Sequence, residues 1–315
     1  MDTSQASQSP TSPPPSRFKM DELKQLYWDR INPIIRYARR NPPLIFGVLL
    51  LGGLMLFVGI GYLVYDTEQY RVLSADPGDT RHPPSLQYPF GTDTAGRDLF
   101  AVAIRGTPLT LRIGLIAGFF AVSFGTVLAF IAAYYRGLVD GTVRVMADVG
   151  MTVPPLLILI LIAINIEGGL SVDQMGLAVA TVAWVWPART IRAQVLIMRE
   201  QSYVEIARLS GSSGMAIIFK EMMPNLIPYI TASFVTSVAA GILASIGLEA
   251  LGLGPFDSPT LGMTIFWNIQ QSSIILGMWW WWLPPIVAIV IVFVGLFLIS
   301  SGLDEWSNPR LRQRV

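Results

Sequence analysis

The sequence predicts an all-α protein that crosses a membrane several times. Of its 315 residues, 52% are hydrophobic and only 14% are charged, and the mean hydropathy is +0.53. Soluble domains carry about 25% charged residues. Long apolar segments follow one another along the chain, and most of the charged residues fall between them. These observations together predict a polytopic membrane protein.

Six segments reach the length of about 20 residues that a spanning helix needs. We place the six transmembrane helices at residues 44–65, 109–135, 143–166, 174–198, 225–248 and 283–303. Residues 258–282 are uncharged as well, but Gly, Pro, Gln and Ser interrupt them. We therefore interpret 250–282 as a partly buried loop outside the membrane with a short helix in it, rather than as a seventh span.

The placement of Lys and Arg orients the chain, because cytoplasmic loops carry an excess of both. With the N-terminus inside, fifteen of them fall on the cytoplasmic side and four on the outer side, leaving out three near span ends. Both termini are therefore predicted to be cytoplasmic, with 304–315 as a short tail. Segments 66–108 and 250–282 are predicted to be extracytoplasmic, and segment 199–224 cytoplasmic.

The N-terminal region is polar. Residues 1–17 are rich in Pro, Ser and Thr, which is typical of a disordered tail. In residues 18–43 apolar side chains recur at helical spacing and the opposite face is basic, which predicts an amphipathic juxtamembrane helix on the inner surface of the bilayer. Residues 44–65 then form the first transmembrane helix.

Few residues could carry chemistry. Cys is absent and His82 is the one His, so the sequence predicts no catalytic residue and no metal site. None of the three Lys residues follows a Gly, which excludes a phosphate-binding P-loop in this chain. The net charge of +1 lacks the basic field that nucleic acid would need. We expect no cofactor here: if ATP drives the protein, partner subunits bind the ATP and Mg.

Ionisable residues within the predicted spans are few. Asp148 follows Arg144 by one turn, which predicts an i, i+4 ion pair. Arg189 and Arg192 are expected to extend toward the cytoplasm, and Glu249, at the outer end of the fifth span, is expected to reach the interface. The absence of a chain of acids or His argues against a proton-coupled or ion-coupled pump.

Four consecutive tryptophans, Trp279, Trp280, Trp281 and Trp282, precede the last span. An aromatic belt at the outer interface explains such a run. The alternative is an outer gate, in which some of the rings line the mouth of a pathway and stack on a ligand. Four successive helical residues cover about 300° of arc, so the rings cannot all face the same surroundings.

Segment 199–224 is neither apolar enough to span a membrane nor charged enough to be an ordinary loop. Residues 199–210 favour a helix, and 211–214, Gly-Ser-Ser-Gly, permit a sharp turn. Residues 215–222 predict a second short helix before Pro224 starts the fifth span. Glu205 and Arg208 are placed as an i, i+3 pair on the surface of this helical hairpin.

This segment resembles the EAA signature of permease subunits of binding-protein-dependent ABC importers. That signature reads E-A-A, three residues, Gly, nine residues, I, one residue, L-P. Glu205 and Ala207 stand in the E-A-A places, and Gly211 and Pro224 follow at the same spacing. The departures from the signature are Ile206, Glu221 and Met223.

Residues 89–98, PFGTDTAGRD, resemble a stretch of the dipeptide/oligopeptide permease family, in its second-position or C-type subunit. The matching residues are Gly91, Thr92, Asp93, Gly96, Arg97 and Asp98, followed by Gly106 and Gly114. Pro108 stands where that family often has a basic residue. Residues 186–196, 251–254 and 302–312 also match, so that the resemblance covers roughly 36–312.

The resemblance implies the fold of a type I ABC importer permease, with 109–303 as a five-helix core after the first span. It implies a cytoplasmic coupling helix that docks on an ATPase, formed by Tyr203, Glu205, Ala207, Arg208, Gly211 and Pro224. The implied partners are a second, homologous permease subunit, two ABC ATPase subunits, an extracytoplasmic solute-binding protein and the lipid bilayer of a bacterial or archaeal plasma membrane.

The implied activity is ATP-driven import of di- or oligopeptides, with this chain forming half of the pathway. Import of oligosaccharides or another small solute by the same class of importer remains an alternative. An ATP-independent channel or secondary transporter is the alternative from another class, although no internal repeat supports it.

Overall fold

The computed structural model describes residues 41–65, 67, 80–135 and 137–307. The predicted tail at 1–17 lies outside the described residues, as do most of the predicted juxtamembrane helix at 18–43 and residues 308–315 of the C-terminal tail. Within the described ranges the chain is helical, and its single extended pairing is an isolated bridge between Thr92 and Asp98.

The helices follow the chain in this order: α3 Pro42–Val64, α4 Leu99–Tyr135, α5 Gly137–Thr152, α6 Pro155–Ile164, α7 Val172–Ala183, α8 Val185–Arg199, α9 Ser202–Leu209, α10 Gly214–Ala216, the π-helix η4 Ile217–Met222, α11 Met223–Ala250, α12 Leu261–Gln270 and α13 Trp279–Ser307.

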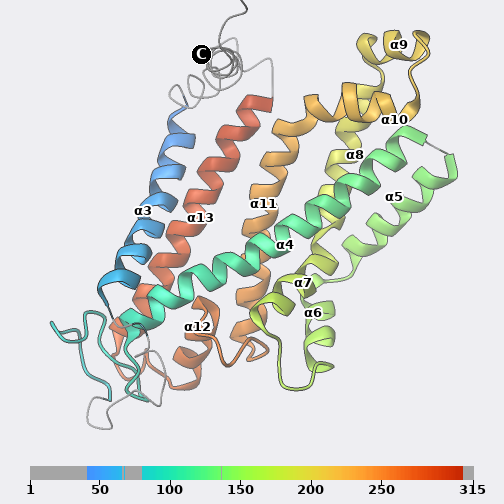
Figure 1. The fold of residues 1–315 in the computed structure, drawn as a ribbon. Coiled ribbons are helices and arrows are strands. Elements are labelled where there is room, and N and C mark those ends of the chain that lie inside the picture. Colours follow the sequence, from blue (N-terminus) through green and yellow to red (C-terminus); the bar gives the residue numbers. More distant parts are fainter. Residues whose placement is uncertain (1–40, 66, 68–79, 136, 308–315) are drawn as a thin grey trace, which may run out of the picture.

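The long helices form a bundle and extend from one end of the molecule to the other (Figure 1). Helices α3 and α13 lie side by side at one edge, α11 and the oblique α4 occupy the middle, and α5 and α6 lie at the opposite edge. One end carries α9 and α10 and is called the α9 end below. The other carries α12 and the loop before α4 and is called the α12 end.

Four helical stretches in the described part of the chain are long and apolar enough to cross a membrane: Pro42–Val64, Leu99–Tyr135, Gly214–Ala250 and Trp279–Glu305. The predicted third span is not one straight helix, because α5 and α6 meet at an angle of 82°. Pro154 and Pro155 stand at this bend and cannot donate helical hydrogen bonds. Counting the bent pair as one span gives up to five.

The predicted fourth span, 174–198, is also interrupted. Helix α7 ends at Ala183 and α8 begins at Val185, with Trp184 between them. Pro187 accounts for the break, because it has no N–H to bond the carbonyl one turn earlier.

Helix α4 starts at Leu99, ten residues before the expected start at 109, so that the predicted loop 66–108 ends at Asp98. Asp98 accepts hydrogen bonds from the N–H groups of Phe100 (2.7 Å) and Ala101 (3.4 Å), which satisfies the first turn as an N-cap does. Pro108 lies inside this helix.

Small residues bring α4 close to its neighbours. A Cβ on Gly114 would lie 2.4 Å from Ile242 Cγ1 of α11, and one on Gly125 would lie 2.8 Å from the backbone N of Ala188 in α8. Close approach at small residues is how helices pack within a bilayer, where there is no water to drive them together. In the most apolar stretch of α4, 50% of the residues are buried, whereas the corresponding shares are 22% in α3 and 28% in α13. Helix α4 is therefore the central helix of the bundle.

Candidate functional site

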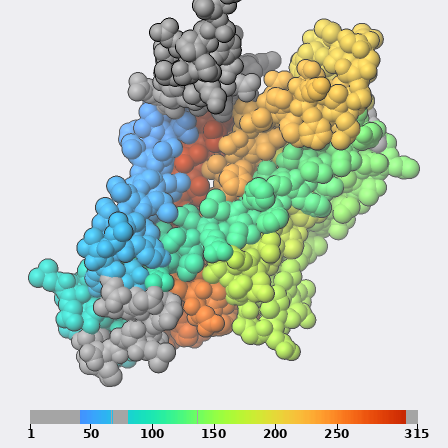
Figure 2. Space-filling model, viewed as in Figure 1, coloured from blue at the N-terminus to red at the C-terminus, as the bar shows by residue number. Residues whose placement is uncertain are grey.

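Helix α9 stands out as a lobe at the α9 end of the molecule (Figure 2). It ends in a turn in which Gly211 N–H donates to Arg208 O and Ser212 N–H donates to Ala207 O, both at 3.1 Å. Gly211 has φ +79°, the left-handed conformation that such a C-terminal turn requires and that Gly adopts without strain. The sequence prediction of a sharp turn at Gly211 is confirmed.

One face of α9 holds it to the bundle. Val204 is fully buried, and Tyr203 and Ala207 are partly buried against a cluster from α4, α8 and the start of α11. The cluster includes Phe130 and Ile191. Tyr203 and Ala207, which the signature placed among the coupling residues, therefore help to anchor the helix.

The opposite face of α9 is exposed. It carries Glu205 and Arg208, and also Ile206 and Leu209, which are 63% and 82% exposed. Large apolar side chains exposed among charged ones are typical of a surface that another protein covers. From the sequence, Ile206 was noted only as a departure from the EAA signature, and Leu209 was not singled out. Their i, i+3 spacing, which places both side chains on one face of a helix, could have identified the pair. The expected Glu205–Arg208 ion pair is absent from the described ion pairs.

After the turn, α10 and η4 run directly into α11 as one helical stretch, Gly214–Ala250, of 37 residues. The prediction of a separate short helix at 215–222 is therefore wrong, and Pro224 does not start the span. Pro224 lies in the first turn of α11, directly after the π-helical turns of η4. Because Pro224 has no N–H, it cannot continue the regular hydrogen-bond pattern of the stretch, and the helix changes from π to α next to it. Pro224 itself is exposed.

The base of this segment is fixed to the end of α4. A Cβ on Gly214 would lie 2.7 Å from Tyr134 Cε1, so only Gly leaves room for that ring. The Arg199 guanidinium lies 5.8 Å from the centre of the same ring, a cation–π distance, and Arg199 Nη1 donates to Ala133 O at 3.1 Å. A force on α9 therefore reaches α4, α8 and α11 together.

At the α12 end, residues 89–98 form a compact turn, which we call the motif loop. Asp93 is fully buried; its Oδ1 accepts from the N–H groups of Ala95 (2.8 Å) and Arg97 (2.9 Å). Its Oδ2 lies 2.5 Å from Arg97 Nε in an ion pair. Asp93 and Arg97 are thus occupied within the loop and unavailable to a solute.

The remaining motif residues are structural as well. Thr92 Oγ1 accepts from His82 N–H at 2.8 Å, and Gly91 and Gly96 have φ values of +68° and +78°. Asp98 caps α4, and its other oxygen accepts a hydrogen bond from the Tyr65 hydroxyl at the end of α3. Burial raises the pKa of Asp98, while these hydrogen bonds act in the opposite direction.

The motif loop meets the tryptophan run. Trp280 Nε1 donates to Thr92 O at 3.3 Å across 188 residues of sequence, and a Cβ on Gly91 would lie 2.7 Å from Trp280 Cδ1. The Arg97 guanidinium lies 5.7 Å from the centre of the Trp267 ring in α12. Together with the contacts of Asp98, these contacts connect the motif loop to α3, α4, α12 and α13. The motif loop therefore holds the four helices together at the α12 end.

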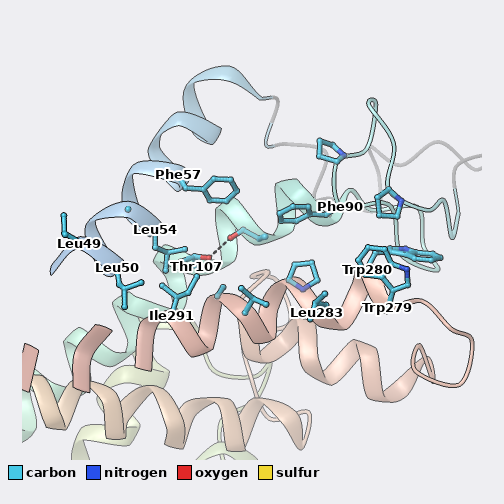
Figure 3. A pocket seen from close by; sticks show the side chains of 17 residues that line it. Leu49, Leu50, Leu54, Phe57, Phe90, Thr107, Trp279, Trp280, Leu283 and Ile291 are labelled. Carbon is cyan, nitrogen blue, oxygen red and sulfur yellow. Dashed lines mark hydrogen bonds between the residues drawn. The ribbon is translucent and has the colours of Figure 1, made fainter. Parts of the chain in front are cut away.

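The four tryptophans have different surroundings, as the arc of a helix requires. Trp281 is buried, Trp280 and Trp282 are partly buried, and Trp279 is about half exposed. Trp279 and Trp280 stand at one end of an apolar cavity of about 670 Å³ between α3 and α13 (Figure 3). Apart from Thr107, its lining consists of glycine and of aliphatic, aromatic and proline side chains. The outer gate stays a prediction.

Glu249, near the end of α11, does not reach the interface as expected. It is fully buried, and its Oε2 accepts from Thr260 Oγ1 at 2.8 Å, at the start of α12. A Cβ on Gly262 would lie 1.9 Å from that oxygen, so Gly262 makes room for it. The turn after Ala250 folds α12 back over the carboxylate. Glu249 thereby attaches α12 to α11.

The charged residues in the middle of the chain form pairs between α5 and α8. The expected pair of Arg144 and Asp148 is present at 3.7 Å. Arg189 and Arg192 do not extend freely toward the α9 end, because Arg189 contacts Asp148 at 3.4 Å and Arg192 contacts Asp140 at 2.5 Å. Among the residues that the structure describes, no group of three His, Cys, Asp or Glu side chains is placed to hold a metal.

Comparison with known proteins gives one family match and several relatives. Residues 125–313 match the family described as binding-protein-dependent transport system inner membrane component. The dipeptide transport system permease protein DppC of Bacillus subtilis is 28% identical over 278 residues, 88% of this chain and 85% of that protein. A putative peptide transport system permease protein of Brucella suis is 34% identical over 233 residues, 73% and 76% of the two chains. The glutathione transport system permease protein GsiD of Escherichia coli is 28% identical over 248 residues, 79% of each.

Proposed function

The chain belongs to the family of inner membrane components of binding-protein-dependent transport systems, and we propose that it is the permease subunit of an ATP-driven importer of di- or oligopeptides. The relatives are named as dipeptide, peptide and glutathione permeases, which supports the substrate class. The chain is a multi-pass membrane protein that works with partner subunits and supplies a pathway rather than covalent chemistry.

The topology that we propose has six spans with both termini in the cytoplasm. The helices α3, α4, α11 and α13 each cross once, and the interrupted pairs α5/α6 and α7/α8 each count as one crossing. The excess of Lys and Arg then puts the α9 end in the cytoplasm and the α12 end outside. Irregular backbone within a membrane is tolerated only where protein or a water-filled cavity covers it. The break at Val153 and Pro154 is exposed in this chain, so the proposed topology requires a partner subunit or water there.

The observation that carries the proposal is the exposed face of α9. It presents Glu205, Ile206, Arg208 and Leu209 on a helix whose other face is locked to the bundle, with Gly211 setting the turn behind it. A docking face needs both features, because a partner must bind it and its displacement must reach the spans. We propose that this face binds an ABC ATPase subunit, and that ATP and Mg are bound by two such subunits.

The mechanism that follows is alternating access. Closure of the two ATPases on ATP draws the α9 helices of this chain and of a homologous second permease subunit together, and the pathway opens outward. A solute-binding protein then delivers peptide, and hydrolysis returns the pathway to the cytoplasmic side. Because coupling between sites is reciprocal, the loaded binding protein should raise ATP turnover.

The test uses the complete complex in proteoliposomes, with ATP inside and the peptide-loaded binding protein outside. Wild type should import a dipeptide only with ATP. Glu205→Arg and Leu209→Arg should assemble at normal levels but abolish ATP-dependent uptake. Glu167→Arg, which changes an exposed glutamate in the turn after α6 at the α12 end, is the matched control and should transport normally.

Three results would count against the proposal. Uptake without ATP would indicate a channel or secondary transporter. Import of an oligosaccharide but not of peptides would keep the importer and change its substrate. Wild-type uptake by both α9 variants would show that this face is not the docking surface.

A further inference from the structure

A stripe of charged side chains joins α5 to α8. Asp140, Arg144 and Asp148 follow one another at i, i+4 spacing on α5, and Arg189 and Arg192 stand at i, i+3 on α8, so each set lies on one helical face. The two faces are turned toward each other: every described ion pair of these five residues lies within the stripe.

The stripe reaches deep into the bundle. Asp140 lies at the start of α5, and Asp148 is eight residues further on, about 12 Å at 1.5 Å per residue. Arg189 is ten residues before Arg199, which marks the α9 end, and is therefore about 15 Å from it. That depth is about half of a 30 Å hydrocarbon core. Charged side chains at such depth are costly next to lipid and almost always face the bundle interior or a water-filled cavity. Arg189 and Asp148 are about half exposed, so the cavity is the description that fits them.

The ion pairs of the stripe are of two kinds. Arg192 and Asp140 make two short contacts, Nε to Oδ1 at 2.5 Å and Nη2 to Oδ2 at 2.7 Å, and both side chains are about one-fifth exposed. This pair ties α5 to α8. Arg189 reaches Asp148 by a single contact at 3.4 Å, and both side chains are about half exposed. A contact so long and so open exchanges partners easily.

The open pair borders a groove of about 200 Å³. The floor consists of Val143, Ala147 and Ala188, and the walls are charged. Among the described residues of the stripe there are three guanidinium groups and two carboxylates, and Asp148 is shared by Arg144 and Arg189. One positive charge is left over. The groove therefore suits an anionic group of small size.

We propose that this groove is a substrate site in the cytoplasmic half of the pathway, and that it binds the C-terminal carboxylate of a peptide between Arg189 and Arg144. The inference rests on the proposed function. A carboxylate entering the groove replaces Asp148 as the partner of Arg189, and a planar guanidinium pairs with a carboxylate through two parallel hydrogen bonds. Every peptide with a free C-terminus carries this group whatever its side chains, so the site accepts such peptides irrespective of sequence.

The first test compares two versions of one tripeptide, with a free C-terminal carboxylate and with a C-terminal amide, in the reconstituted complex. Arg189→Gln should lower uptake of the free acid by about tenfold or more, the usual effect of losing a hydrogen bond to a charged group, and leave uptake of the amide as in wild type. Arg112→Gln is the matched control, because Arg112 pairs with Asp173 at 2.7 Å with similar exposure. Its uptake of both peptides should be unchanged.

The second test needs no binding protein, and it is possible because the chain contains no Cys. Met151 Sδ lies 3.1 Å from Arg189 Nη1, so Met151→Cys places one thiol beside the groove, next to Arg189, in the assembled complex. A negatively charged, membrane-impermeant thiol reagent added at the cytoplasmic side should label it. The free-acid tripeptide should slow the labelling, and the amide should not. Val149→Cys, an exposed apolar position of α5 outside the groove lining, is the control and should show no protection.

The outcomes separate the two proposals. If the wild-type complex imports neither tripeptide, the proposed substrate class is wrong. If the complex imports them, two results would show that the groove is not a carboxylate site and would leave the proposed function standing. The first is that Arg189→Gln lowers the uptake of both tripeptides equally or of neither. The second is that the two tripeptides slow the labelling of Met151→Cys equally or not at all.

Discussion

Replacing Gly106 by Ala should separate α4 from the loop that leads into α12. A Cβ at this position would lie 2.1 Å from the carbonyl oxygen of Pro259, whereas Cβ atoms essentially never come within 3.0 Å of another heavy atom. The two backbones must therefore move apart by the difference, about 0.9 Å. No rotamer change can relieve the contact, because both groups belong to the main chain.

The magnitude follows from what this movement breaks. Overpacking of this kind costs about 1–3 kcal/mol. One turn further along α4, Thr110 Oγ1 accepts a hydrogen bond from Leu261 N–H at 2.9 Å, and losing a buried bond adds about 1–3 kcal/mol. Ala favours a helix over Gly by up to about 1 kcal/mol. The net loss in the free energy of unfolding should be about 1–5 kcal/mol.

The assay is thermal unfolding of the purified chain in detergent, followed by the fluorescence of its nine Trp residues, of which Trp267 and Trp281 lie at this end. Gly52→Ala in α3 is the matched control, because a Cβ there meets nothing within 4 Å. Gly52→Ala should unfold at or slightly above the wild-type temperature. If Gly106→Ala does the same, the close approach of α4 to Pro259 is refuted.

Three further predictions concern the α12 end. Burial raises the pKa of Asp98, so wild type should lose stability relative to Asp98→Asn as pH rises from 3.8 through the folded-state pKa. A difference in unfolding temperature between the two proteins that does not change with pH would contradict this. Trp280→Phe keeps an aromatic ring but loses the indole N–H that bonds Thr92 O and part of the ring that packs on Gly91. It should destabilise the chain by at least about 0.5–1.5 kcal/mol in the same assay, and a neutral effect would show that this bond is dispensable. Glu249→Ala leaves the buried hydroxyl of Thr260 without its acceptor and should lower the free energy of unfolding by about 1–3 kcal/mol. Glu249→Gln keeps an acceptor and should show only a small part of this loss. Equal losses in both variants would show that the charge matters rather than the hydrogen bond.

The sequence predicted the bounds of the continuous, uncharged spans well. It predicted the bounds poorly where a charged side chain has a partner far away in the sequence. Helices α3 and α13 lie where their apolar runs predict them. The start of α4 was missed because Arg105 and Pro108 interrupt its apolar run. Arg105 is accommodated by the Tyr62 ring, 5.7 Å from its guanidinium, and by Thr67 Oγ1 at 3.1 Å. Local hydropathy contains no information about such partners.

The predicted coupling residues show the same limit. Spacing alone identified the segment and its turn at Gly211, because a left-handed turn depends on one residue type. It did not separate Tyr203 and Ala207, which pack inward, from Ile206 and Leu209, which face out. Which side of an amphipathic helix is covered depends on α4, α8 and α11, which the chain brings together only on folding.

The continuous helix from Gly214 to Ala250 acts as a lever arm. At 1.5 Å per residue its 37 residues extend about 55 Å, so a tilt of only 5° about its π-helical end displaces the far end by about 5 Å. Glu249 fastens that far end to α12. A small rotation of this helix about the end beside α9 would therefore move the α12 end, where Glu249 is attached, much further than it moves the α9 end.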